Sequence, residues 1–206
     1  TLAGIAGADV GFFRDERPIA QAVTDREGFA TVSFTPPRRG DYEILARVLD
    51  VEDPADEAML QLTPARVLVA ARPREAKIVV VDMDHTVVAS GFHRVLLGGA
   101  APMAGSEAVL ERISRNYEVV YLTHRPDLLG RRSKSWLTQH GFPVGPVLTS
   151  DIQQMLGGSG PFKTAKLAEL RQAFPNVKIG IGDKISDARS YADNGIDAYL
   201  IPYYDP

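Results

Sequence analysis

Two aspartates separated by one residue follow a run of branched apolar residues near the middle of the chain. Asp82 and Asp84 come directly after residues 78–81, Ile-Val-Val-Val. Such a run is typical of a strand buried in a sheet, where carboxylates are rarely left without partners. One carboxylate can attack phosphorus, and a second can transfer protons to and from the reacting groups. The pair is therefore a candidate for phosphoryl-transfer chemistry at the end of a central strand.

Further reactive side chains fall at or near the ends of other predicted elements. Ligands gather at the carboxyl ends of the strands in a doubly wound sheet, so these side chains can meet the aspartate pair. Clustered carboxylates need a cation, and ligands that offer only oxygen suit Mg²⁺. A hydroxyl and an ammonium group can hold phosphoryl oxygens as charge develops on them. The candidates are Thr123, Lys163, Asp183 and Asp187.

The part of the chain that carries these residues alternates between strand and helix patterns. Strands alternating with helices indicate an α/β fold with a parallel, doubly wound, five-stranded sheet. The strands are predicted at residues 78–82, 118–123, 146–150, 177–183 and 197–202. The helices are predicted near residues 106–115, 127–140, 163–173 and 186–194.

The N-terminal part has closely spaced strand patterns separated by Gly and Pro turns. In residues 29–35, apolar Ala30, Val32 and Phe34 alternate with polar residues, which is the period of a half-buried strand. Such spacing favours a small all-β sandwich. The other strands are predicted at residues 8–15, 18–23, 42–50 and 65–71, with a loop over residues 51–57. The predicted domains are residues 1–72 (sandwich) and 77–206 (α/β), joined by a linker, residues 73–76.

Residues 24–34 and 39–48 resemble immunoglobulin-like and transthyretin-like modules of bacterial multidomain proteins. Because such modules are common in exported proteins, the resemblance favours a bacterial periplasmic or secreted location. The sequence opens at Thr1 without a basic-then-apolar leader, as expected of a processed or trimmed end.

Composition excludes several kinds of site. The chain has 206 residues, of which 45% are hydrophobic, and this is enough for a packed core. The formal net charge of −3 and the sequence pI of about 5.8 argue against general nucleic-acid binding. There is no cysteine, which excludes disulfides, thiolate metal sites and cysteine nucleophiles. No apolar run approaches the ~18 residues that suggest a membrane-spanning helix.

Four short motifs occur in order along the α/β part. Residues 82–87, Asp-Met-Asp-His-Thr-Val, resemble the DxDxT(V/L) signature of the haloacid dehalogenase (HAD) superfamily. Residues 121–125 match its second motif, Lys163 its third, and residues 182–187 its GDxxxD fourth motif. Each motif falls on the expected kind of element, so the resemblance covers residues 77–206.

The resemblance implies a phosphatase that works through an aspartyl-phosphate. In this superfamily the dehalogenases lack an aspartate at the second position of the signature and the transport ATPases carry threonine there, so Asp84 points to phosphatase or phosphomutase chemistry. By the same resemblance, Asp82 is the nucleophile and Asp84 is the general acid/base. The implied Mg²⁺ ligands are Asp82, the backbone carbonyl of Asp84 and Asp183, with Asp187 either a further ligand or a hydrogen-bond partner of the ligands. The residues implied to hold the phosphoryl group are Thr123 and Lys163.

The stretches from Thr86 to Thr123 and from Thr123 to Lys163 are too short to contain a folded cap domain. A capless member of the superfamily leaves its site open to bulky or surface-bound substrates. Residues 121–196 also resemble the catalytic domains of lipins and of actin-patch-associated phosphatidate phosphatases. This resemblance implies a phosphatidate-like lipid or another bulky phosphate ester as substrate, with peripheral membrane contact.

Several positions have more than one interpretation. His85 departs from the usual Gly or Asp of the signature, and it is a candidate for substrate binding together with Arg125. Lys166 is the alternative to Lys163. A basic cluster on a predicted helix is either a solvated face or a docking surface for anionic lipid; it consists of Arg131, Arg132 and Lys134. The alternative function is a catalytically weak phosphate- or lipid-binding module attached to an interaction domain.

Overall fold

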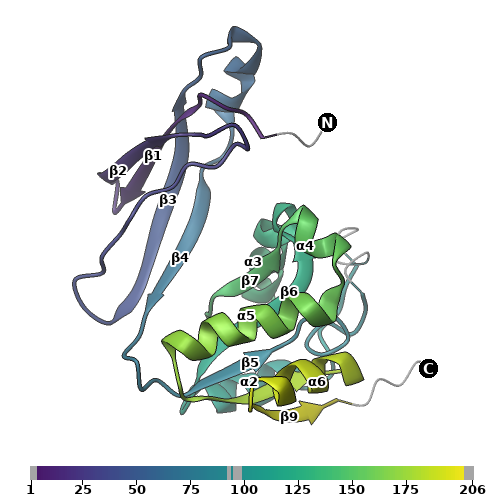
Figure 1. Ribbon diagram of the computed structural model, residues 1–206. Helices are drawn as coiled ribbons and strands as arrows, with labels where there is room; N and C mark the ends of the chain where they lie inside the picture. The colour runs from purple at the N-terminus through teal and green to yellow at the C-terminus, as the bar shows by residue number, and fades with distance from the viewer. Residues whose placement is uncertain (1–3, 92–93, 95–98, 202–206) are drawn as a thin grey trace. The chain divides into compact units, whose positions relative to one another are not determined.

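The computed structural model describes residues 4–91, 94 and 99–201 of the chain. The chain divides into two compact units, Thr1–Arg72 (unit 1) and Pro73–Pro206 (unit 2), each with its own sheet (Figure 1).

Unit 2 is built on a five-stranded parallel sheet, as predicted, in the order β7-β6-β5-β8-β9. The strands are β5 (Ile78–Val81), β6 (Glu118–Pro126), β7 (Val147–Ser150), β8 (Val177–Gly182) and β9 (Asp197–Leu200). The helices are α2 (Ser106–Ser114), η2 (Asp127–Leu129), α3 (Gly130–Gln139), α4 (Ile152–Leu156), α5 (Ser159–Ala173) and α6 (Ile185–Asp193). In the described part of the chain, none of the helices is long and apolar enough to cross a membrane.

The central strand β5 is buried on both faces because helices cover both sides of the sheet. Val79 and Val81 point into a core that includes side chains of α2 and α3. Ile78 and Val80 point into a second core that includes side chains of α5 and α6. This explains the continuous apolar run in the sequence, since no residue of β5 faces water. Asp82 is the first residue after this buried strand.

Strand β6 is longer than predicted and irregular where it ends. Leu122 pairs with Leu148, but Pro126 pairs with Ser150, so β6 has four residue steps where β7 has two. An insertion of this kind bends the strand and redirects its side chains. The irregular residues are Thr123, His124 and Arg125, which all lie at the candidate site.

Unit 1 contains a four-stranded antiparallel sheet in the order β2-β1-β3-β4. Its strands are β1 (Asp9–Arg14), β2 (Arg17–Val23), β3 (Gly40–Asp50) and β4 (Ala65–Ala71), and the 3-10 helix η1 (Pro54–Gln61) lies between β3 and β4. The loop predicted at residues 51–57 is therefore partly helical, and the Asp53 side chain caps its start by accepting from the Ala55 N–H at 2.9 Å.

The strand predicted at residues 29–35 is not a strand in the structure. The segment is extended and alternates in burial, but among the described residues it has no neighbour to pair with. The alternation between buried and exposed side chains was predicted correctly, but a strand also requires a neighbouring strand with which to form backbone hydrogen bonds. The described residues of unit 1 thus form one sheet and not the predicted two-sheet sandwich.

Candidate active site

A buried lysine bridges two buried aspartates at the carboxyl end of the parallel sheet. Lys163 on α5 donates to Asp82 Oδ1 at 2.7 Å and to Asp187 Oδ1 at 2.6 Å. All three side chains are almost completely enclosed. Buried charges of this kind persist only when they are paired. Lys166, the alternative lysine, instead pairs on the surface with Glu169.

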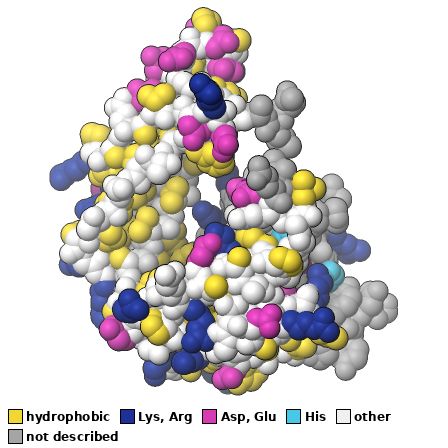
Figure 2. Space-filling view, viewed as in Figure 1, with side chains coloured by type: hydrophobic (Ala, Val, Ile, Leu, Met, Phe, Trp, Pro, Cys, Tyr) yellow, Lys and Arg dark blue, Asp and Glu magenta, His cyan; other side chains and the backbone are white. Residues whose placement is uncertain are grey.

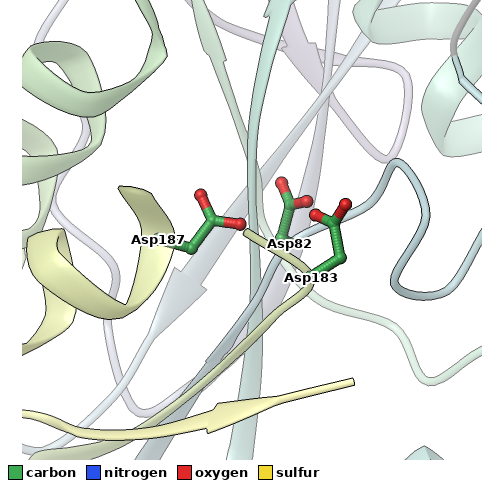
Figure 3. Close-up of side chains that lie close together, drawn as sticks. All are labelled: Asp82, Asp183 and Asp187. Carbon is green, nitrogen blue, oxygen red and sulfur yellow. The ribbon is translucent and has the colours of Figure 1, made fainter. Parts of the chain in front are cut away.

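Three carboxylates converge beside this lysine. Asp82 follows β5, Asp183 follows β8 and Asp187 lies in the first turn of α6, and Figure 3 shows their carboxylates pointing into a common space. Their ligand atoms lie within 4.8 Å of one another. Asp183 Oδ1 is buried without a hydrogen-bond partner among the described residues. A single ammonium cannot balance three carboxylates, and the all-oxygen donor set fits a hard divalent cation such as Mg²⁺.

The enclosure of the site changes how these groups titrate. Burial raises the pKa of Asp82 to about 6, although Lys163 opposes the shift, and the nearby Asp187 adds to it. Burial also raises the pKa of Asp183. For Lys163, burial alone lowers the pKa, but the charges of Asp82 and Asp187 outweigh it and raise the pKa overall. Lys163 is therefore a cation at neutral pH, while burial favours the protonated forms of Asp82 and Asp183.

The glycine of the fourth motif allows Asp187 to approach the sheet. A Cβ atom on Gly182, the last residue of β8, would lie 2.8 Å from both Cβ and Oδ2 of Asp187. The backbone N–H of Lys184 donates to the same Asp187 Oδ2 at 3.3 Å. A side chain at position 182 would displace the Asp187 carboxylate. The motif therefore needs glycine at this position for a steric reason.

Asp84 is held by a buried arginine. Arg125 donates to Asp84 through Nε at 3.0 Å and through Nη2 at 2.6 Å, which is a bidentate pair. Its Nη1 donates to Ser133 Oγ on α3 at 3.0 Å. Arg125 was predicted to bind substrate; the residue is only 3% exposed, and its guanidinium lies against the side chain of Asp84. Arg125 therefore fixes the orientation of the predicted acid/base.

Ser133 was missed by the sequence reasoning, although the sequence contains a signal for it. Leu129, Trp136 and Leu137 share its face of the helix at spacings of three and four residues. All of them are buried, and so is Ser133. A hydroxyl on an apolar helix face needs a partner, and here the partner is the guanidinium.

Thr123 and His85 flank the aspartates. Val81 pairs with Tyr121, so buried Thr123 lies just beyond the end of β5, where its hydroxyl accepts from the Arg125 backbone N–H at 3.3 Å. His85 has a φ of 58°, in the left-handed region that glycine adopts without steric cost. Glycine, one of the two residues usual at this place in the signature, adopts this conformation without strain. The charge of His85 also opposes the effect of burial on the pKa of Asp183.

Comparison with known proteins assigns the unit that carries this site. A family model described as the LNS2 domain of PITM 1–3 matches residues 79–201, which is more than half of the chain. The chain belongs to the LNS2 domain family. The membrane-associated phosphatidylinositol transfer proteins 3 of mouse and human are each 30% identical to this LNS2 domain protein over 132 residues. That match covers 63% of this chain and only 12% of the length of each relative.

Solved structures show which fold the LNS2 unit has. A chain of the Pnkp1/Rnl/Hen1 RNA repair complex aligns with a TM-score of 0.55 at 14% identity, covering 72% of this chain and 54% of that one. A Mesorhizobium loti protein described as a HAD-like phosphatase aligns with a TM-score of 0.50 at 16% identity, covering 64% and 76%. The LNS2 unit thus has the HAD-like fold that the four motifs predicted.

Proposed function

We propose that unit 2 is a Mg²⁺-dependent phosphomonoester hydrolase that forms an aspartyl-phosphate on Asp82. The observation that carries the proposal is the ammonium of Lys163 between Asp82 and Asp187, with Asp183 beside them. A structural ion pair needs one carboxylate, whereas here one ammonium donates to two, and a third carboxylate lies within 4.8 Å of both. Such a concentration of negative charge is useful where a divalent cation and a phosphoryl group are to be bound.

Each side chain has a defined task in this reaction. Asp82 attacks phosphorus and displaces the alcohol, to which Asp84 delivers a proton; Asp84 then takes a proton from the water that hydrolyses the aspartyl-phosphate. Lys163 fixes one oxygen of the nucleophile and faces the charge that develops on the phosphoryl group. Mg²⁺, held by Asp82, Asp183 and Asp187, would neutralise that charge further. Arg125 keeps Asp84 in place.

Large apolar side chains on the segments around the site support a bulky, amphiphilic substrate. Leu128 follows β6, Leu156 follows β7 and Ile185 follows β8, and their exposed fractions are 57%, 82% and 69%. All three segments leave the carboxyl edge of the sheet, where the phosphate would bind. We call these three residues the apolar rim. The rim fits a phosphate ester with a hydrocarbon part, such as a phosphatidate-like lipid at a membrane surface, and the relatives are named membrane-associated proteins.

The first experiment tests catalysis without assuming the natural substrate. The protein should release phosphate from an aryl phosphate when Mg²⁺ is present and lose this activity in EDTA. Asp82→Asn should lower the rate by about a thousandfold or more, since it removes the nucleophile. Phosphate release by Asp82→Asn at the wild-type rate would refute the assignment.

A second experiment tests the substrate class. Turnover of phosphatidate in mixed micelles is compared with turnover of soluble sugar phosphates and nucleotides. Leu156→Ser and Ile185→Ser should lower the ratio of micellar to soluble turnover. Val144→Ser is the matched control, because Val144 is 72% exposed but precedes β7 at the opposite edge of the sheet. Faster turnover of a soluble ester, or an equal effect of Val144→Ser, would rule out the lipid substrate.

One observation favours a second function, a binding module with little catalysis. Both carboxylate oxygens of Asp84 accept from Arg125, so Asp84 can deliver a proton only if that pair opens. A module of this kind would bind inorganic phosphate or phosphatidate vesicles without turnover. Undetectable Mg²⁺-dependent phosphate release, together with phosphate binding that Lys163→Met removes, would favour this function over hydrolysis.

A further inference from the structure

The irregular end of β6 carries site residues that are not aligned with a neighbouring strand. β5 pairs with β6 as far as Tyr121, while β7 pairs with Tyr121 and Leu122 and then only with Pro126. Among the described residues, the three between Leu122 and Pro126 have no directly opposite partner on either side. Their backbone therefore depends on hydrogen bonds from side chains. These three residues are Thr123, His124 and Arg125.

One buried hydroxyl, that of Ser150, supports two of these residues. Ser150 is the last residue of β7 and is 0% exposed. Its Oγ donates to the His124 carbonyl at 3.0 Å and to the Arg125 carbonyl at 3.2 Å. A hydroxyl has a single proton, so the two carbonyls share it. Because this hydroxyl holds both carbonyls, it restricts the backbone dihedral angles of Arg125, which lie between them.

The backbone of Arg125 is thereby held on both sides of its Cα atom. Its N–H donates to Thr123 Oγ1 at 3.3 Å, and its C=O accepts from Ser150. The guanidinium of Arg125 makes the bidentate pair with Asp84, and two such bonds form together only when the side chain starts from the right place. The orientation of Asp84 thus depends on the backbone that Ser150 holds.

The turn that follows Ser150 supports the same part of β6. The Nε2–H of His124 donates to the Gln154 carbonyl of α4 at 3.3 Å. Gln154 also closes the capping box of α4, because its N–H donates to the Asp151 side chain at 2.7 Å and its side chain accepts from the Asp151 N–H at 3.1 Å. Asp151 directly follows Ser150, so consecutive parts of the chain hold His124 by its carbonyl and by its ring.

We propose that Ser150 is a positioning residue of the hydrolase proposed above, and that it keeps the end of β6 in the form in which Arg125 orients Asp84. Its effect on turnover rests on the proposed function, whereas its effect on Arg125 does not. A serine that only fills a buried position would contribute to stability and would leave the pair of Arg125 and Asp84 unchanged.

The first test measures the pairing of Arg125 without any substrate. The Nε–H of Arg125 is buried and donates to Asp84, so it should exchange slowly with solvent and give a ¹⁵N NMR signal that Arg125→Lys removes. Ser150→Ala should raise this exchange rate about tenfold or more. Ser150→Cys has nearly the same shape but a weak donor, and it should give a similar rise even where the alanine variant does not fold.

The matched control is another buried serine of unit 2 that donates to two carbonyls. Ser190 on α6 is 2% exposed, and its Oγ donates to the Gly160 carbonyl at 3.2 Å and to the Ser186 carbonyl at 3.0 Å. Ser190→Ala should shift the urea midpoint about as much as Ser150→Ala and leave the exchange of Arg125 Nε–H unchanged. An unchanged rate in both Ser150 variants, or an equal rise in Ser190→Ala, overturns the proposal.

The second test measures turnover. Ser150→Ala should lower kcat about tenfold with little change in KM, and it should lower kcat little further in a chain that already carries Arg125→Lys, because both changes act on Asp84. The loss in kcat/KM should be larger for an alkyl phosphate, whose alcohol leaves only with a proton, than for nitrophenyl phosphate. Ser190→Ala should keep kcat. Because both serines are buried, neither change alters the mixed hydrophobic and charged surface over α5 and α6 (Figure 2).

The outcomes separate this inference from the proposed function. A wild type that releases no phosphate contradicts the hydrolase, and the exchange of Arg125 Nε–H still decides whether Ser150 positions Arg125. An active wild type in which the effects of Ser150→Ala and Arg125→Lys on kcat are additive, or in which both esters lose equally, overturns the role of Ser150 and leaves the hydrolase in place.

Discussion

Lys163 is the residue on which the arrangement of the site most depends. Removal of one member of a buried ion pair leaves a charge without compensation and costs about 3–5 kcal/mol. Lys163→Met should therefore lower the free energy of unfolding by an amount of this order and reduce turnover at least about a hundredfold. Urea denaturation and phosphate release measure the two effects. Lys166→Met is the control and should change neither the free energy of unfolding nor the rate of phosphate release. Equal losses in the two variants would contradict the role assigned to Lys163.

The contact between Arg125 and Asp84 suggests a test of whether Arg125 positions Asp84 or binds the substrate. Lysine keeps the positive charge of Arg125 but cannot make the bidentate pair or reach Ser133 at the same time. Arg125→Lys should therefore lower kcat by about ten- to a hundredfold with little change in KM. Steady-state kinetics with an aryl phosphate decide the matter. If KM rises while kcat is kept, then Arg125 binds the substrate, as predicted from the sequence.

The raised pKa of Asp82 has a consequence for stability in the absence of metal. In the folded protein the pKa is about 6, above the ordinary value of 3.8, so the native state binds more protons between these two pH values. The free energy of unfolding in EDTA should therefore fall as pH rises from about 4 to 6 and then level off. Asp82→Asn should flatten this dependence. Urea midpoints at a series of pH values test it, and an equal slope in both proteins would contradict it.

The turn from β8 into α6 sets the position of Asp187. Because a Cβ at position 182 would lie 2.8 Å from the Asp187 carboxylate, Gly182→Ala must displace that side chain. We expect about a tenfold or greater loss in Mg²⁺ affinity, measured by the concentration of Mg²⁺ that restores phosphate release to the metal-free protein. Gly160→Ala in α5 is the control, since no atom lies within 4 Å of the added Cβ. An equal Mg²⁺ affinity in the two variants would show that the site tolerates the shift.

The parallel sheet could be predicted because its signal is local. The apolar run of β5 and the carboxylates after β5 and β8 follow from sequence order and from the rule that strand ends share one edge. The pairing of Arg125 with Asp84 could not be predicted, since it depends on the irregular end of β6 and on Ser133 from a neighbouring helix. Helix α4 was also missed, because its five residues are too few for a periodic pattern.

In unit 1 the alternation of apolar and polar residues correctly predicted the strands that pair in the sheet. It wrongly predicted a strand at residues 29–35, which pair with no other described segment. Residues 30–35 alternate as clearly as β3 does, but alternation reports only which side is covered. Strand pairing is a relation between segments, so the residue spacing within one segment cannot show whether another segment lies beside it. The same reasoning explains why a sandwich was predicted where the described residues contain a single sheet.

The two units bury very different amounts of apolar side chain, so we expect them to unfold separately. Ala8 and Ile44 are the buried apolar residues of unit 1 among the described residues, whereas unit 2 has two cores. The single tryptophan, Trp136, lies in unit 2, where its Nε1–H donates to the Ala100 carbonyl at 3.0 Å. Tryptophan fluorescence therefore reports on unit 2, while circular dichroism reports on both units.

Thermal unfolding should accordingly show two transitions that differ in their response to Mg²⁺. A ligand that binds only the folded state raises the temperature of the corresponding transition by mass action. The lower transition, seen only by circular dichroism, should not depend on Mg²⁺, because the carboxylate cluster lies in unit 2. The upper transition, seen also by fluorescence, should rise with Mg²⁺ because the cation relieves the repulsion among Asp82, Asp183 and Asp187. A single transition that coincides in both probes would contradict separate unfolding.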